Sequence, residues 1–248
     1  MFFGRAGKKP DWQMIDMHCH ILPGLDDGAQ DISESVAMLK IAASEGVSDM
    51  VVTPHFRPGR FTASPEKVLE TLWKVQKTAE REQIPIRLYP GNEVYYFDDM
   101  AAYLKQQKLC TLNGSACVLI EFSPSAMLRT IQNAADKLLN EGYRPILAHV
   151  ERYESLQANA EDAVFLHEMG MQLQVNASTM MGKAGTASKR FVYRLLDENA
   201  VDYIGSDAHG SRHRTPEIAR CRDAIIKRYG YEYAQRLMRS NALEMIGL

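Results

Sequence analysis

The stretch Met14-Ile15-Asp16-Met17-His18-Cys19-His20 is an apolar run that ends in two histidines separated by one residue. Residues two apart on a β-strand point to the same face, so His18 and His20 can reach one metal ion while Cys19 turns to the opposite face. Asp27 follows in the next turn, and later apolar runs also end in His, Glu or Asp, at residues 51–55, 91–93, 118–121, 146–149 and 204–209. If these runs are parallel strands, their ends describe one site at the mouth of a barrel.

The composition is that of an ordinary protein with one large core. The chain has 248 residues, of which 46% are hydrophobic and 24% are charged. Single α/β-barrel domains reach this length, so no second domain is required. A net charge of -2 and a pI near 6.4 give no reason to expect nucleic acid or an anionic membrane as the main partner. No apolar run approaches the length of a membrane-spanning helix, so we expect no stable membrane insertion.

The cysteines and the first residues bear on the compartment. None of Cys19, Cys110, Cys117 and Cys221 forms a C-x-x-C pair, so we interpret them as reduced thiols of a cytoplasmic protein. Residues 1–12 are basic at their start and lack the apolar core of a signal peptide. We expect a flexible arm there, followed by a single domain over 13–248. A weak membrane-surface or docking role for the arm stays open, through Phe2, Phe3, Lys8 and Lys9.

Short apolar runs alternate with longer amphipathic segments, which is typical of βα units around a parallel sheet. Expected strands cover 13–18, 49–54, 86–90, 117–122, 145–149, 171–175 and 202–206. Expected helices cover 31–46, 65–82, 97–107, 124–141, 160–170, 186–199, 216–229 and 231–246, with capping patterns at Asp31 and Ser64. Seven βα units suffice to close an α/β barrel, and the tract 176–190 reads as a long loop beside its mouth.

Histidines and carboxylates gather at the expected strand ends. Five of the seven histidines fall there, whereas isolated core or surface histidines would be scattered. Imidazole and carboxylate donors without thiolate suit Mn²⁺, Fe²⁺, Co²⁺ or Zn²⁺ rather than a structural zinc site. Nine donors exceed what one ion holds, so we expect two or three ions that share a carboxylate. The candidate ligands are His18, His20, Asp27, His55, Glu93, Glu121, His149, Asp207 and His209.

The charge of such a cluster indicates its substrate. Four carboxylates against two or three dications leave it neutral to positive, which favours an anionic substrate such as a phosphate ester. Paired metals also lower the pKa of a bridging water and stabilise both oxygens of an in-line displacement. Other catalytic schemes lack their motifs: there is no Cys-x₅-Arg, no G-x-S-x-G elbow, no phosphate-binding loop and no G-x-G-x-x-G fingerprint.

The motifs H-x-H, T-P-H, G-N-E, I-E-F, A-H-x-E-R and S-D-A-H resemble those of the PHP (polymerase and histidinol phosphatase) superfamily of metal phosphoesterases. Residues 15–28, 119–122 and 148–153 are most similar to the bacterial manganese-dependent protein-tyrosine phosphatases encoded with capsule and exopolysaccharide genes. The resemblance runs from about Met14 to the last helix. It implies a distorted seven-unit βα barrel of the PHP type with three metal ions.

The resemblance also implies a role for each ligand. One ion would be held by His18, His20, Glu93 and Asp207. Glu93 would bridge to a second ion held by Glu121 and His149, and the third would be held by Asp27, His55 and His209. Arg152 and Arg214 match the phosphate-contacting arginines of the family, although Arg212 lies two residues from the second.

Arginine binds two phosphate oxygens through a planar fork that lysine cannot reproduce. Arg152 lies on the turn after the fifth expected strand, so it should stand over the cluster; the alternative is a salt bridge to Glu154 or a helix cap. Arg57 and Arg60 either line the same mouth or belong to a solvated loop. A set of aromatic residues either stacks on an aromatic leaving group or anchors neighbouring elements, namely Phe56, Phe61, Tyr95, Tyr96 and Phe97.

We therefore predict a cytoplasmic, manganese-dependent protein-tyrosine phosphatase. Its substrate would be a phosphotyrosine-containing protein, the tail of a bacterial tyrosine kinase that controls polysaccharide synthesis. A small-molecule enzyme such as a histidinol-phosphate phosphatase is the first alternative, and it would need a deeper, more closed pocket. A non-catalytic metal-binding module is the second, and it would lack several ligands, whereas none is missing here.

Overall fold

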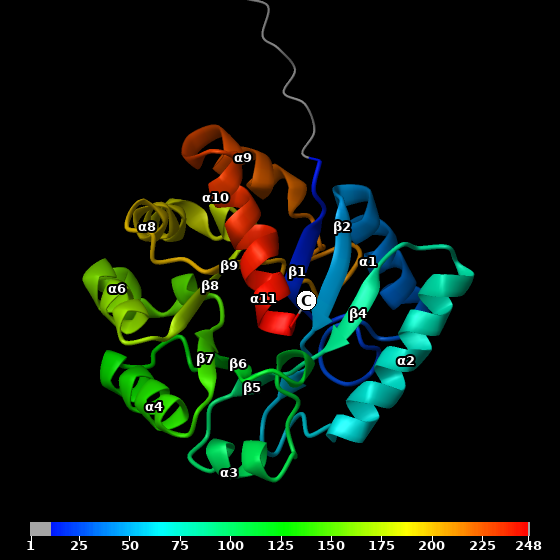
Figure 1. Ribbon diagram of the computed structural model, residues 1–248, viewed down its shortest axis with the longest axis horizontal. Coiled ribbons are helices and arrows are strands. Elements are labelled where there is room, and N and C mark those ends of the chain that lie inside the picture. The colour runs from blue at the N-terminus through cyan, green and yellow to red at the C-terminus, as the bar shows by residue number, and fades with distance from the viewer. Residues whose placement is uncertain (1–10, 248) are drawn as a thin grey trace, which may run out of the picture.

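Strand β1 (Met14–Cys19) lies near the centre of the computed structural model, which describes residues 11–247 (Figure 1). The strands form two groups, of which β1 belongs to the first, and every pairing between named strands is parallel. The first group has the order β1, β2 (Val47–Val52), β4 (Arg87–Pro90). The second has the order β3 (His55–Phe56), β5 (Glu93–Tyr95), β6 (Cys117–Glu121), β7 (Arg144–Leu147), β8 (Gln172–Asn176), β9 (Tyr203–Gly205).

The two groups meet on both sides. Residues 53–54 lead from β2 directly into β3, and residues 91–92 lead from β4 into β5. On the other side, a parallel bridge joins Cys19 to Ala208, just past β9. The sheet therefore curls into a half-barrel, with the C-terminal ends of its strands at one edge. This confirms the predicted α/β fold with a parallel sheet, while the closed seven-unit barrel stays a prediction.

Helices surround the curled sheet in Figure 1. The predicted starts of two of them are confirmed, since the Asp31 carboxylate accepts from the Glu34 N–H at 2.9 Å and the Ser64 hydroxyl accepts from the Lys67 N–H at 3.3 Å. The helices are α1 (Ile32–Glu45), α2 (Pro65–Arg81), α3 (Met100–Lys105), α4 (Leu128–Asn140), α5 (Glu154–Ala158), α6 (Ala160–Glu168), α7 (Ala177–Met180), α8 (Gly185–Asp197), α9 (Ala219–Tyr229), α10 (Tyr231–Gln235) and α11 (Asn241–Ile246). Short 3₁₀ turns cover Leu112–Gly114 (η1) and Val150–Arg152 (η2), and a π-helical turn over Arg236–Ser240 joins α10 to α11.

Two sequence expectations are wrong in detail. The tract 176–190 is not a loop, because it contains α7 and the start of α8. Positive φ angles occur at Gly182, between the two helices, and at Gly185, the first residue of α8. The helix expected over 124–141 begins only at Leu128, because a turn with a hydrogen bond from Ala126 to Ser123 precedes it. Glycine and proline mark chain reversals reliably, but they do not say how many residues separate the elements.

The interior of the half-barrel is closed at the end opposite the C-terminal ends of the strands. Ile15 and Met17 of β1 lie in an inner apolar cluster with Met245 and Ile246 of α11. Because side chains alternate between the two faces of a regular strand, His18 would be expected to point outward when Met17 points inward. The pairing of β1 with β2 shifts register between Asp16 and Cys19, which changes the alternation, so the next residues can also face inward. The C-terminal helix thus seals the base and leaves the mouth for polar groups.

The N-terminal boundary differs slightly from the sequence expectation. Trp12, which the sequence places in the flexible arm, is buried and packs edge-on against Tyr231 at 6.0 Å between ring centroids. The packed part of the chain therefore includes this residue. The rest of the predicted arm, residues 1–10 with Phe2, Phe3, Lys8 and Lys9, lies outside the described residues. Within 11–247, no helix combines the length and the apolar character that crossing a membrane requires.

Candidate metal centre

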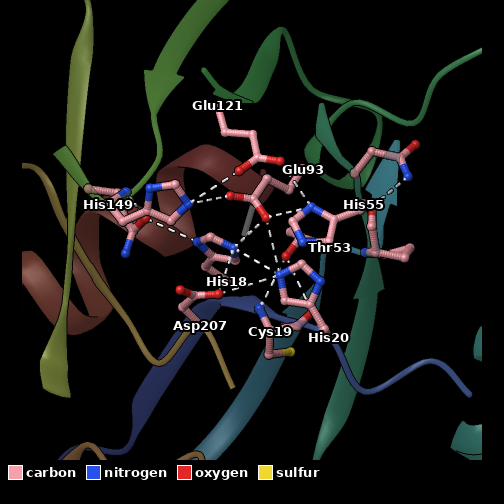
Figure 2. Close-up of polar contacts among 12 residues, drawn as sticks. His18, Cys19, His20, Thr53, His55, Glu93, Glu121, His149 and Asp207 are labelled. Atoms are coloured by element: carbon pink, nitrogen blue, oxygen red, sulfur yellow. Dashed lines mark hydrogen bonds and ion pairs between the residues drawn. The ribbon is translucent and has the colours of Figure 1, made fainter. Parts of the chain in front are cut away.

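The floor of the site is a cluster of four buried side chains from three strand ends. The Nε2 atoms of His18 and His20 lie 3.1 Å apart, and both are 3.2 Å from Oε2 of Glu93 (Figure 2). Asp207, after β9, places Oδ1 at 3.7 and 3.6 Å from the same two nitrogens. All four side chains are at most 2% exposed. This is the set predicted for the first ion, and its donor atoms converge.

The Glu93 carboxylate also contacts two further imidazoles. Its Oε2 lies 3.1 Å from Nδ1 of His55, and its Oε1 lies 2.7 Å from Nε2 of His149. Glu121, at the end of β6, approaches both rings, at 3.2 Å from His55 and 3.7 Å from His149. Four imidazole nitrogens therefore lie within 3.2 Å of one buried carboxylate, as a shared ligand requires.

Asp27 and His209 complete the predicted set at the outer side of the cluster. One Asp27 oxygen lies 3.5 Å from His55 and 3.6 Å from His209. The donor atoms that converge within 4.8 Å form three groups: His18, His20, Glu93 and Asp207; His20, His55 and His209; and His55, Glu93 and Glu121. The second and third groups differ from the predicted triplets by one residue each, with His20 in place of Asp27 and His55 in place of His149.

Two supporting residues escaped the sequence reasoning. The Asp26 carboxylate accepts hydrogen bonds from Nδ1 of His20 at 2.7 Å and from the backbone N–H of His55 at 2.8 Å. The Gln174 amide oxygen lies 3.0 Å from Nδ1 of His18 and accepts the backbone N–H of His149 at 2.8 Å. Such partners fix which ring nitrogen of a histidine faces a metal. The one sequence signal was that Asp26 stands beside the candidate ligand Asp27.

Close backbone packing holds these supports in place. A Cβ on Gly28 would lie 2.1 Å from the backbone oxygen of His20, so only glycine lets the turn that carries Asp26 approach β1 this closely. Positive φ angles occur at three non-glycine site residues, His149, Asp207 and Arg214. Such conformations are uncommon and tend to persist at functional sites, where surrounding contacts enforce them.

The charges of the cluster depend on one another. Burial by itself lowers the pKa of His20, but Asp26 and Glu93 outweigh burial and raise it to about 10. Burial also opposes ionisation of Glu93, yet the His18 and His149 imidazoles hold its pKa well below the usual range. Burial, together with the charges of His20 and Arg214, lowers the pKa of His209 to about 2. Buried carboxylates of this kind need cations beside them; bound metal ions would fill that role and leave the imidazoles neutral.

The donor set passes a further test of fit to metal ions. Among the described residues, Oε2 of Glu93 is buried and makes no well-aligned hydrogen bond, although three imidazole nitrogens lie within 3.2 Å of it, and Nε2 of His209 is also buried without a hydrogen-bond partner. Buried polar atoms are normally paired, so orphaned ones call for an ion or a ligand. Cys19 belongs to none of the converging donor groups, and its thiol contacts the Val51 carbonyl at 3.5 Å.

The two predicted arginines meet over the cluster. Arg152 and Arg214 each donate to a different oxygen of Asp207, the second at 2.7 Å, and their side chains remain 41% and 43% exposed. Neither alternative reading of Arg152, a bond to Glu154 or a helix cap, describes this position. Arg212 and Arg214 both line a neighbouring depression that includes Asp27. Arg152 and Arg214 line a cavity of about 470 Å³ that also includes Asn176, Ser178, Thr179, Lys183, Ser188 and Thr215.

The aromatic residues divide between the two readings that the sequence left open. Phe97 packs against Phe56 and Tyr103, and Tyr96 packs against Phe122, so these side chains anchor neighbouring elements. Phe61 instead stacks on the His55 ring, with centroids 5.8 Å apart and planes 13° from parallel. Arg57 lies over the Tyr95 ring at 4.2 Å. These two contacts lie beside the cluster rather than in the core.

Comparison with known proteins places this geometry in context. Residues 14–247 match the family model described as capsular polysaccharide synthesis, CpsB/CapC. The chain is 32% identical over 219 residues to tyrosine-protein phosphatase YwqE of Bacillus subtilis, covering 88% of this chain and 86% of that protein. It is also 32% identical over 238 residues to tyrosine-protein phosphatase CpsB of Streptococcus agalactiae, covering 94% and 98%.

Solved structures agree. The crystal structures of YwqE from Bacillus subtilis and CpsB from Streptococcus pneumoniae, metal-dependent tyrosine phosphatases, include a match with a TM-score of 0.89 at 30% identity, covering 94% of each chain. Histidinol phosphate phosphatase from Lactococcus lactis, complexed with zinc, L-histidinol and phosphate, matches with a TM-score of 0.58 at 12% identity, covering 88% of this chain and 94% of that one. This second likeness is one of fold alone.

Proposed function

The chain belongs to the CpsB/CapC family of capsular polysaccharide synthesis and is a metal-dependent tyrosine-protein phosphatase, and we propose that the cluster around Glu93 is where it hydrolyses the phosphate ester. One observation carries this assignment. Four imidazole nitrogens surround the buried Glu93 carboxylate, and two half-exposed arginines bind Asp207 of the same cluster. Elsewhere among the described residues, no three His, Cys, Asp or Glu side chains bring their donor atoms within 4.8 Å of one another.

The proposal assigns all nine predicted residues to metal binding, with manganese as the ion. One ion would be held by His18, His20, Glu93 and Asp207, a second by Glu93, Glu121 and His149, and a third by Asp27, His55 and His209. The converging donor groups support the first set most directly. Manganese suits a set of imidazole and carboxylate donors with no thiolate. Bound divalent ions would supply an activated water nucleophile and stabilise the oxygens on both sides of phosphorus.

The chain itself would orient the phosphate. Each arginine uses one N–H group on Asp207, and a guanidinium has five donors, so Arg152 and Arg214 keep donors for two phosphate oxygens. Their half-exposed side chains face the solvent from which a protein substrate arrives. Asp26 and Gln174 would hold the ring nitrogens of His20 and His18 toward the ions. The result is a rigid floor below a cationic rim.

The substrate and the setting form the finer part of the proposal. We propose that the phosphotyrosine lies on the tail of a bacterial tyrosine kinase that controls capsule or exopolysaccharide synthesis, in the cytoplasm. The names of the relatives and the description of the family support this choice. We also propose that β2 with β3, and β4 with β5, are the halves of two interrupted strands, which gives a distorted barrel of seven units.

Chelation tests the proposal. The purified protein should hydrolyse a phosphotyrosyl peptide, lose that activity after EDTA treatment and dialysis, and regain it on addition of Mn²⁺. Alanine replacement of Glu93 should prevent the recovery, while replacement of Glu80, an exposed glutamate on α2, should not. Activity that survives exhaustive chelation, with no metal detected by elemental analysis, contradicts the proposal.

A further inference from the structure

A short hairpin beside the metal centre has no role in the assignment above. Arg57 and Phe61 pair as antiparallel residues: the Arg57 N–H donates to the Phe61 carbonyl at 2.7 Å, and the Phe61 N–H donates to the Arg57 carbonyl at 3.0 Å. Pro58 and Gly59 form the turn between them, with φ +78° at Gly59, as a proline–glycine turn requires. The hairpin therefore fixes Phe61 at one position relative to β3.

Phe61 packs there against His55, a proposed metal ligand. The Phe61 ring lies nearly parallel to the His55 ring, 5.8 Å away between centroids, and the Arg60 guanidinium lies 4.8 Å from the Phe61 centroid on its own turn. Phe61 is only partly buried. Part of the ring is therefore open to solvent beside the polar cluster.

Strand register places Tyr95 beside this hairpin. His55 pairs with Glu93 in the parallel ladder, and Tyr95, two residues after Glu93, shares its face of β5 one layer farther out. The next pairing sets Tyr95 opposite Glu121, a proposed ligand. The Arg57 guanidinium covers the Tyr95 ring at 4.2 Å. The hairpin and Tyr95 thus form an aromatic shelf, residues 57–61 and Tyr95, on the β3–β5 side of the mouth.

The opposite side of the mouth has different chemistry. The cavity beyond Arg152 and Arg214 is lined by serine, threonine, asparagine, glutamine and charged side chains, and its only apolar lining residues within 11–247 are Pro124 and Ala184. No aromatic side chain lines that cavity within 11–247, so a phenyl ring placed there would find no ring to stack on. An ester whose phosphate lies between the ions and the arginines would therefore direct its ring toward the shelf.

We propose that Phe61 receives the phenyl ring of the substrate tyrosine, with Tyr95 beside it, so that the aromatic shelf selects aryl over alkyl phosphate esters. This inference rests on the phosphatase function proposed above and adds the residues that determine its leaving-group specificity. Ring–ring contact of this kind corresponds to a roughly 2- to 10-fold change in affinity. The shelf would act on substrate binding rather than on attack at phosphorus.

Steady-state kinetics of Phe61→Ala, Phe61→Tyr and the unmodified enzyme test the inference. Phe61→Ala should raise KM for a phosphotyrosyl peptide about 2- to 10-fold with little change in kcat, and Phe61→Tyr should restore it. The inhibition constant of inorganic phosphate and the metal content should stay unchanged, because neither involves the ring. Phe165→Ala, which removes a half-exposed phenylalanine on α6, is the matched control and should change nothing.

The alternative is that Phe61 only supports His55. In that case Phe61→Ala would weaken inorganic phosphate inhibition or metal content as much as peptide binding, and the inference would be overturned. An unchanged KM for the peptide would overturn it as well. If the proposed phosphatase activity is itself wrong, the unmodified enzyme will not hydrolyse the phosphotyrosyl peptide at all, and this outcome is distinct from any effect of Phe61→Ala.

Discussion

The charged side chains on the floor of the site are buried, whereas those on its rim are exposed to solvent. On the floor, His18, His20, Glu93 and Asp207 are almost completely buried, and each touches at least one other member. On the rim, the side chains of Arg152, Arg214 and Asp27 are 41%, 43% and 50% exposed. A buried charge has no solvent to replace a lost partner, whereas an exposed one does. Changes on the floor should therefore remove function, and changes on the rim should reduce it.

The largest effect is expected at the centre of the floor. Glu93→Ala removes the carboxylate that lies within 3.2 Å of four imidazole nitrogens, so it should lose more than one equivalent of metal together with nearly all turnover. A carboxylate can bridge because it has two oxygens, whereas a neutral imidazole offers one lone pair. Elemental analysis measures the metal content, with Glu80→Ala as the control. Full occupancy in Glu93→Ala would show that this residue is not a bridge.

A smaller effect is expected on the rim. Arg152→Lys keeps the positive charge but loses the fork, and losing a hydrogen bond to a charged group costs roughly 1.5–3 kcal/mol, or about one to two powers of ten in kcat/KM. Arg194→Lys, an exposed arginine paired with Glu161, is the matched control and should be neutral. Metal content should stay normal in both variants. Equal rates for the two variants would remove Arg152 from the phosphate site.

Replacing Asp26, which supports His20 from below the floor, should lower metal affinity without abolishing binding. Asp26→Asn keeps the shape of the side chain but weakens its contact with Nδ1 of His20. Changes to such partners typically lower metal affinity by 10- to 100-fold, and we expect the lower end because the amide oxygen can still accept. Competition with a chelator of known affinity measures the change. Unaltered affinity would mean that β1 alone orients His20.

The smallest effect is expected at the cysteine nearest the site. Cys19→Ser should keep most activity, because the Cys19 thiol points away from the cluster toward the Val51 carbonyl. If water attacks phosphorus directly, no phosphoenzyme should accumulate in any cysteine variant. Turnover assays with and without a thiol-alkylating reagent check this. Alkylation that abolishes activity in saturating Mn²⁺ and requires Cys19 would overturn the metal mechanism.

The convergence of the candidate ligands at one edge of the sheet could be predicted from the sequence because both signals are local. His18 and His20 alternate on one strand, and the donors follow apolar runs, so parallel pairing alone brings them to one edge. The supports are different, because Gln174 reaches His18 from a strand 156 residues away, a relation that no spacing encodes. The register shift in β1 also escaped prediction, since it depends on pairing with β2. Strands β3 and β5 were too short for their alternation to be read.

The most direct test of the whole account is substrate preference measured on one enzyme preparation. With saturating Mn²⁺, kcat/KM should be far higher for a phosphotyrosyl peptide than for histidinol phosphate or the phosphoserine form of the same peptide. We expect this because the open arginine rim admits a side chain projecting from a protein, and because only the tyrosyl ester carries an aromatic ring for the shelf. EDTA should abolish all three activities. A wide preference for histidinol phosphate would contradict the account and favour a small-molecule phosphatase.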